Sequence, residues 1–181
     1  MSNGKNVVVY CSSQDNLPPE CENMAKSVGQ WIGEKGHTLV YGGVDAGLMH
    51  IVAKATHEKG GRIVGVIPEV FKHRADELND ELILTANLNE RKGVMIERGD
   101  VFFVLPGGIG TIDEWISTIS HKKVCGDNSA NIVVINIEGA YDAQIKQLQD
   151  TMSSPYASGD LMRWMKVVKN IDELKDLLNK N

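Results

Sequence analysis

The chain has 181 residues, and a chain of this length buries roughly 70% of the surface that its unfolded form exposes. Its 19 Lys and Arg against 24 Asp and Glu give a net charge of −5, which argues against a nucleic-acid partner, because such binding scales with basic contacts. With 42% hydrophobic residues, the sequence shows neither the signature of disorder nor an apolar run that could span a membrane. We therefore expect one domain over residues 1–181, without a membrane partner, and a cytoplasmic location because no secretory signal is visible.

Short apolar runs rich in Val and Ile alternate with segments of helical spacing. The predicted strands are 7–11, 38–41, 63–67, 101–105 and 132–137. The predicted helices are 20–34, 48–59, 88–98, 112–124, 141–152 and 170–179, and the polar segment 122–131 predicts a surface loop. Asn170 is the expected N-cap of the last helix. This alternation predicts a doubly wound, Rossmann-like α/β fold with a parallel sheet, helices on both faces, and a ligand crevice beyond the carboxyl ends of the strands.

The cysteines and histidines indicate no metal site. Cys11, Cys21 and Cys125 cannot all pair, and neither a CxxC motif nor a Cys/His ligand spacing is present, so free thiols are expected. A nucleophilic Cys11 is the alternative, because it ends a predicted strand, but no residue is singled out as its base.

Six of the 18 glycines fall in two clusters that each follow a predicted strand. These glycines are Gly42, Gly43, Gly47, Gly107, Gly108 and Gly110. After the second cluster a helix is expected to begin near Thr111, with unpaired N–H groups that can bind a phosphate. Neither cluster fits a dinucleotide or P-loop fingerprint, because Asp113 replaces the last glycine of GxGxxG and Leu48-Met49 replaces Lys-Ser/Thr. A tight turn without a ligand is the alternative for the second cluster.

Glu114 has two interpretations that the residues alone leave open. Thr111 and Glu114 have the T-x-x-E spacing of a capping box, in which the glutamate folds back onto the start of its helix. A carboxylate at a helix start is equally well placed to meet a ligand bound at that helix end.

The motif Pro106-Gly-Gly-Ile-Gly-Thr-Ile-Asp-Glu114 resembles the PGGxGTxxE motif of the Lonely Guy family of cytokinin-activating nucleoside 5'-monophosphate phosphoribohydrolases. Further segments are similar to that family in the same order. They are Leu39-Val-Tyr-Gly-Gly43, Gly47-Leu-Met49, Val64-Gly-Val-Ile-Pro68 and Glu90-Arg-Lys92, with Met95 and Asp100 following. The resemblance therefore covers most of residues 6–140.

This resemblance implies hydrolysis of the N-glycosidic bond of a purine-type nucleoside 5'-monophosphate, releasing free base and ribose 5-phosphate. It assigns the catalytic roles to Arg91 and Glu114. The substrate contacts that it implies are Lys92, Gly43, Gly107, Gly108, Gly110, Thr111, Asp113 and Ser120. It implies a small-molecule nucleotide as substrate, no cofactor, and a homodimer. The chemistry is consistent, since a carboxylate can stabilise positive charge developing on the ribose and an arginine can hold the leaving base, the ribose or the phosphate.

Val44 and His50 depart from the family pattern, which often has glycine at both positions, and could narrow the pocket near the base. His50 is open to two interpretations, an acid for the leaving base or a packed or solvated side chain. The alternative function is a nucleotide or pterin-cofactor carrier without catalysis. A lysine decarboxylase is disfavoured, because no lysine lies in a context suited to a Schiff base with pyridoxal phosphate.

Overall fold

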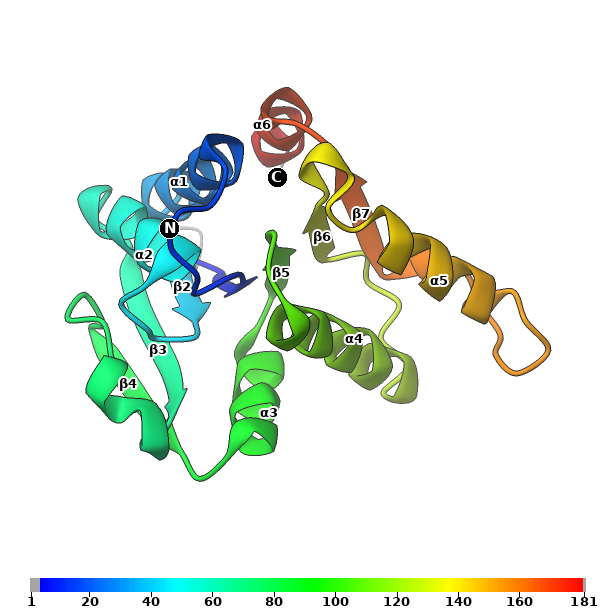
Figure 1. Ribbon diagram of the computed structural model, residues 1–181, viewed down its shortest axis with the longest axis horizontal. Helices are drawn as coiled ribbons and strands as arrows, with labels where there is room; N and C mark the ends of the chain where they lie inside the picture. The colour runs from blue at the N-terminus through cyan, green and yellow to red at the C-terminus, as the bar shows by residue number, and fades with distance from the viewer. Residues whose placement is uncertain (1–3, 181) are drawn as a thin grey trace.

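Seven parallel strands form one sheet in the computed structural model, which describes residues 4–180 (Figure 1). The strands are β1 (Asn6–Tyr10), β2 (Thr38–Tyr41), β3 (Arg62–Pro68), β4 (Glu81–Thr85), β5 (Val101–Val104), β6 (Ile132–Ile135) and β7 (Met165–Val168). Their order in the sheet is β4-β3-β2-β1-β5-β6-β7. The chain thus reverses its direction of winding between β1 and β5, which are hydrogen-bonded neighbours. A ligand crevice is expected beyond the carboxyl ends of strands at such a reversal.

Helices cover both faces of this sheet. They are α1 (Pro19–Glu34), α2 (Gly47–Glu58), α3 (Leu88–Arg98), α4 (Ile109–Val124), α5 (Asp142–Met152) and α6 (Ile171–Asn179), with the short 3-10 helices η1 (Glu69–Arg74), η2 (Ile137–Gly139) and η3 (Leu161–Arg163). One hydrophobic core contains side chains of α1, α2 and α6, and a second contains side chains of α3, α4 and α5 (Figure 1). The predicted doubly wound α/β fold is confirmed. Within residues 4–180, no helix combines the length and apolar character needed to cross a bilayer.

The central strand β1 supplies apolar side chains to both cores. Val7 and Val9 belong to the core with α1, and Val8 and Tyr10 to the core with α4. Each of these side chains is at most 1% exposed. Full burial stabilises a valine by about 1.5–3 kcal/mol over an exposed one, which explains why the strand has no alternating polar positions.

Five strands agree with the prediction to within two residues, whereas β4 and β7 were not predicted. Both are edge strands, and their sequences lack the uninterrupted apolar pattern. In β4, Glu81 accepts hydrogen bonds from Arg62 (2.8 Å) and Arg98 (3.1 Å), and in β7 Lys166 is exposed. A strand paired on one side and partly covered can carry such charges, so its sequence resembles that of a loop.

The start of α4 and the start of the following loop differ from the prediction, and one cap is confirmed. α4 begins at Ile109, three residues before the predicted start, and it continues through Val124, so the predicted loop 122–131 begins after that residue. Lys122 is therefore helical and buried, and its Nζ donates to Ser129 Oγ at 2.9 Å. The Asn170 side chain caps α6 as predicted, accepting hydrogen bonds from two backbone N–H groups of the first turn.

Candidate active site

Arg91 and Glu114 meet where α3 approaches the start of α4. Arg91 Nη1 donates to Glu114 Oε1 at 2.5 Å, and Arg91 Nε donates to the carbonyl oxygen of Val66 at 2.9 Å. The two charged side chains are 11% and 6% exposed. Gly42 at the end of β2 leaves the space for this arginine, because a Cβ at Gly42 would lie 2.7 Å from Arg91 Nη2. The guanidinium is therefore held from the sheet on one side and by the carboxylate on the other.

Glu114 has a pKa above its usual value. Burial is the main cause, since it disfavours the charged carboxylate, and Asp113 raises the pKa further. Arg91 and Lys92 act in the opposite direction, and burial outweighs them. A glutamate with a raised pKa is suited to hold or move a proton closer to neutral pH than an exposed one.

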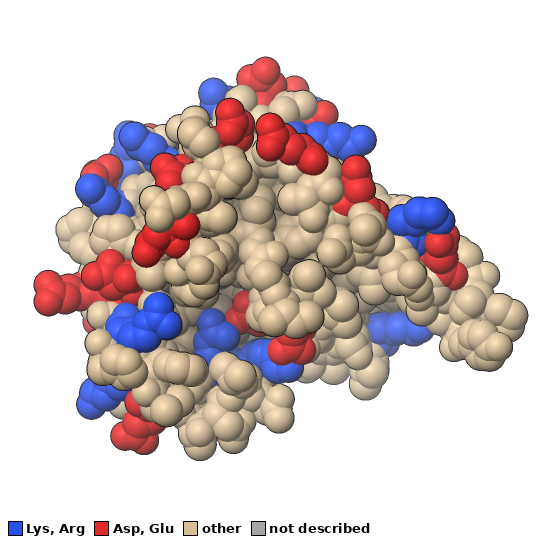
Figure 2. Space-filling view, viewed as in Figure 1, with Lys and Arg blue, Asp and Glu red and all other residues tan. Residues whose placement is uncertain are grey.

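A second ion pair joins the neighbouring residues of the same two helices. Lys92 Nζ donates to Asp113 Oδ2 at 2.8 Å and to Oδ1 at 3.0 Å, and the Ser117 hydroxyl donates to the same carboxylate at 3.4 Å. Lys92 is 18% exposed and Asp113 53%, so this pair faces solvent. Basic and acidic side chains gather where α3 and α4 meet on the face shown in Figure 2.

The glycine-rich turn presents the start of α4 to open space. A Cβ at Gly107 would lie 2.2 Å from Thr111 Oγ1, so the turn requires glycine there. At Gly108 and Gly110 a Cβ would meet nothing within 4 Å. The first N–H groups of α4 are thus accessible, and together with the helix dipole they can bind an anion.

The capping-box interpretation of Glu114 is wrong. Gly108, and not Thr111, is the N-cap of α4, and it provides no side-chain cap. Thr111 lies inside the first turn and is 4% exposed. Glu114 instead pairs with Arg91, and its backbone carbonyl accepts a hydrogen bond from the Thr118 hydroxyl at 2.8 Å.

Arg91, Glu114 and the start of α4 line a cavity of about 290 Å³ at the carboxyl ends of β1 and β5. Its lining consists of Cys11, Ser12, Ser13, Gln14, Met49, Arg91, Gly108, Ile109, Gly110, Thr111 and Glu114. The sequence pattern alone does not indicate the part of the lining that the β1–α1 loop, residues 12–14, supplies. The signal that could have found it is the pairing of β1 with β5, which brings the loop after β1 beside the glycine-rich turn; Ser12 N donates to the Pro106 carbonyl at 3.1 Å.

Cys11 also lines the cavity, but its environment disfavours a nucleophile. Burial raises the pKa of the Cys11 thiol far above its usual range, and the nearby Glu114 raises it further. The three cysteines are free, with Cys125 exposed. A thiol that resists ionisation in this way is a poor nucleophile.

Three of the predicted contact residues line the cavity, and five lie outside its lining: Gly43, Lys92, Gly107, Asp113 and Ser120. Lys92 and Asp113 form the solvent-facing ion pair, and Gly107 shapes the turn before α4. Gly43 has φ of +72°, and a Cβ there would lie 3.2 Å from Gly65 Cα, so its role in this structure is to shape the turn after β2. Its carbonyl accepts from Asp76 N at 2.8 Å and Asn79 Nδ2 at 3.1 Å. Ser120 lies exposed on α4, two turns beyond the cavity.

The two departures from the family pattern do not narrow this cavity, because neither Val44 nor His50 lines it. His50 Nδ1 lies 2.9 Å from both Asp45 Oδ1 and Asp76 Oδ2. Among the described residues, these three side chains are grouped as metal ligands could be, because one ligand atom from each lies within 4.8 Å of the other two. Asp76 already accepts from His50 and from Leu78 N, so the cluster is satisfied as an internal hydrogen-bond network.

A doubly wound parallel sheet with a glycine-rich helix start and a buried Arg–Glu pair at its carboxyl edge defines a Rossmann-like α/β protein. A family model described as "Possible lysine decarboxylase" matches residues 49–178, and the chain belongs to this family. The cytokinin riboside 5'-monophosphate phosphoribohydrolase of Mycobacterium marinum is 37% identical over 169 residues, which cover 92% of this chain and 89% of the relative. The enzyme of the same name from Oryza sativa subsp. japonica is 30% identical over 161 residues, covering 88% and 66%. The resemblance found in the sequence is thereby confirmed.

Solved structures show the same fold at lower identity. The molybdenum cofactor binding protein from Rippkaea orientalis superposes with a TM-score of 0.74 at 18% identity, covering 99% of this chain and 98% of the other. The molybdenum cofactor carrier protein from Chlamydomonas reinhardtii gives a TM-score of 0.75 at 18% identity, with 98% of each chain covered. At this identity the likeness is one of fold alone.

Proposed function

We propose that the protein hydrolyses the N-glycosidic bond of a purine-type nucleoside 5'-monophosphate, of the adenosine or cytokinin riboside kind, to free base and ribose 5-phosphate. The observation that carries the proposal is the buried Arg91–Glu114 pair, which lines the same cavity as the open helix start at Gly108 and Gly110. The names of the relatives point to the same reaction. The pair supplies charged groups for the bond cleavage, and the helix start supplies a place for the phosphate.

In this reaction the bond between the base nitrogen and C1' of the ribose breaks, and its electron pair leaves with the base. Positive charge then develops on the ribose ring, and the Glu114 carboxylate stabilises it. Water adds to C1', and Glu114 accepts the proton that this water loses. The leaving base takes up a proton, so the products are neutral base and ribose 5-phosphate.

Arg91 has two roles in this proposal. Its charge is permanent, so it keeps Glu114 in place and lowers the pKa of that carboxyl against the effect of burial. Its remaining N–H groups can hold ribose, phosphate or base in register. In this proposal the substrate phosphate binds at the N-terminus of α4, with Thr111 in the first turn. The Lys92–Asp113 pair lies beside the next turn of the same helix.

The test is a product assay over a panel of monophosphates. We expect AMP and its N6-isopentenyl analogue to release free base and ribose 5-phosphate, and adenosine without phosphate to remain uncleaved. A protein that is folded by circular dichroism and releases no base from any purine monophosphate would contradict the proposal. Cleavage of adenosine at the same rate as AMP would contradict only the proposed phosphate site at α4 and not the reaction itself.

A carrier of a nucleotide or a pterin cofactor is the second candidate, since proteins named as molybdenum cofactor binding or carrier proteins share this fold. A carrier uses the helix start but has no need of a buried glutamate with a raised pKa. The two functions are therefore separated by turnover. Stoichiometric binding of AMP with no release of base would support the carrier.

We also propose a homodimer, on the basis of an apolar stripe along α4 that no other element of the described chain covers. Ile109, Ile116 and Val124 are 83%, 41% and 84% exposed, and Ser120 lies on the same side of the helix. Light scattering should give twice the monomer mass for the unaltered protein and the mass of one monomer for Ile116→Asp. A monomeric mass for the unaltered protein would contradict the dimer and leave the reaction untouched.

A further inference from the structure

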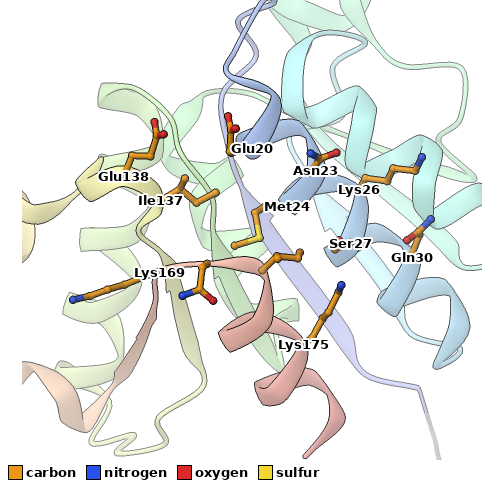
Figure 3. Close-up of a pocket in the computed structure, with 12 residues that line it drawn as sticks. Glu20, Asn23, Met24, Lys26, Ser27, Gln30, Ile137, Glu138, Lys169 and Lys175 are labelled. Atoms are coloured by element: carbon orange, nitrogen blue, oxygen red, sulfur yellow. The ribbon is translucent and has the colours of Figure 1, made fainter.

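A second cavity, of about 550 Å³, lies between α1 and α6 at the same edge of the sheet (Figure 3). One wall is α1, and the other consists of η2 and the turn that leads from β7 into α6. None of its lining residues also lines the cavity of Arg91 and Glu114. α1 packs closely against α2 on its other side, whereas it faces α6 across this open space. The volume is typical of cavities that bind small molecules.

The floor of this cavity is apolar. Met24 of α1, Ile137 of η2 and Ile171 of α6 contribute to it from three separate elements. Met24 and Ile137 are buried, and Ile171 is half-buried. An apolar group that covers this floor would remove their remaining exposed surface from water, and the flexible methionine can adapt to its shape.

The wall formed by α1 carries neutral hydrogen-bonding groups. Asn23, Ser27 and Gln30 follow one another at intervals of four and three residues, so they lie on one side of the helix, towards the cavity (Figure 3). None of the three side chains hydrogen-bonds to another residue in the range 4–180. Their amide and hydroxyl groups are therefore available to a ligand.

Charges of opposite sign lie at different ends of the cavity. Figure 3 shows Lys175 extending from α6 towards α1, while Glu20 and Glu138 lie at the other end. Lys175 forms no ion pair with any described carboxylate. Lys26 and Lys169 add two further cations to the rim. One end thus favours an anion, and the other end repels it.

We propose that this cavity binds a small amphipathic monoanion, with an apolar body and one carboxylate. The apolar body packs on Met24, Ile137 and Ile171, and the carboxylate lies beside Lys175 within reach of Ser27 and Gln30. One ammonium directed into the cavity matches one negative charge. The carboxylates of Glu20 and Glu138 prevent the reverse orientation and disfavour a second negative charge on the ligand. This binding is independent of the proposed reaction, because it uses none of the residues of the other cavity.

The first test uses the fluorescence of 8-anilinonaphthalene-1-sulfonate, which has an aromatic body and one negative charge. We expect saturable binding to the full chain, weakened about tenfold or more by Lys175→Glu, which reverses the charge beside the anion. Ser27→Trp should weaken it similarly, because the indole fills the cavity from α1. The control Lys54→Glu makes the same charge change on α2, where the exposed lysine lines neither cavity, and should leave the affinity unchanged.

The second test is displacement of this probe by two molecules with the same apolar chain and opposite charges. Octanoate should displace it, and octylamine should not. The proposal would be overturned if the probe showed no saturable binding. It would also be overturned if the probe bound equally well to the unaltered protein, Lys175→Glu and Ser27→Trp, with the melting temperatures of the variants unchanged. Displacement by octylamine as effective as that by octanoate would overturn the assignment of an anionic ligand.

Discussion

Arg91 and Glu114 are 23 residues apart in the sequence, and their side chains form a 2.5 Å ion pair that is almost excluded from solvent. α3 and α4 cover the same face of the sheet, and Arg91 Nε is bound to the Val66 carbonyl of β3. The sheet therefore fixes the arginine, and the arginine fixes the carboxylate. Removing either residue leaves the other as a buried charge without its partner.

Replacing Arg91 with alanine should destabilise the protein. Breaking a buried ion pair by removing one partner costs about 3–5 kcal/mol, so the melting temperature should fall by roughly 6–20 °C in a chain of this size. The double variant Arg91→Ala/Glu114→Gln should regain most of this loss, because it removes the unpaired carboxylate. Equal melting temperatures for the single and double variants, measured by calorimetry, would show that the buried charge is not the cause.

The stability of the Arg91→Ala variant should also depend on pH. The folded-state pKa of Glu114 lies above the unfolded value of 4.5, so between the two values the folded protein binds more protons. The free energy of unfolding therefore falls as pH rises through this window and is constant above it. Loss of Arg91 raises the pKa further and widens the window. In urea titrations, the free energy of unfolding of Arg91→Ala should lie closer to that of the unaltered protein at about pH 4 than at about pH 7.

The acid limb of kcat/KM should report the pKa of Glu114, since the carboxylate form is the active one. Activity should rise with pH at values above those of an ordinary glutamate. Lys92→Gln should move this limb to higher pH, because Lys92 lowers the pKa, and Asp113→Asn should move it to lower pH, because Asp113 raises it. Shifts in the same direction for both variants would contradict Glu114 as the titrating group.

How far the sequence predicts this fold depends on burial. β1, β2 and β5 are covered on both faces, so their uninterrupted apolar runs identify them, whereas the edge strands β4 and β7 carry charges and were missed. The capping-box spacing of Thr111 and Glu114 favours a start of α4 near Thr111, whereas the helix begins at Ile109. The sequence does not show how α3 packs on β3. This packing brings Arg91 to Glu114, and so it determines that Glu114 pairs with the arginine and does not cap its helix.

Gly42→Ala tests the space that glycine leaves for Arg91. The new Cβ would lie 2.7 Å from Arg91 Nη2 and from Met49 Cε. The methionine can move at little cost, whereas Arg91 can move only by weakening its hydrogen bonds to Val66 and Glu114. Displacement of Arg91 should lower kcat by about 10²-fold. Gly93→Ala is the matched control on α3, because its Cβ would meet nothing within 4 Å and it lines no part of the cavity. Similar activities of the two variants would argue against Gly42 as the determinant.

Gly110→Ala should separate stability from binding. Its Cβ meets no atom within 4 Å, so alanine in the first turn of α4 should raise stability by about 0.5–1 kcal/mol. The same methyl group would project where the substrate phosphate is placed, so KM for AMP should rise. A higher melting temperature with an unchanged KM would show that the substrate phosphate does not bind at this turn.

The most direct measurement compares the unaltered protein and Glu114→Gln for release of free base and ribose 5-phosphate from AMP. The amide keeps a hydrogen bond to Arg91 but removes the charge that neutralises the guanidinium, so the melting temperature should fall by less than in Arg91→Ala, and AMP should still bind. Loss of the group that accepts the proton should lower kcat by about 10²–10⁴-fold. Turnover within a factor of about two of the unaltered protein, with AMP bound, would contradict the account.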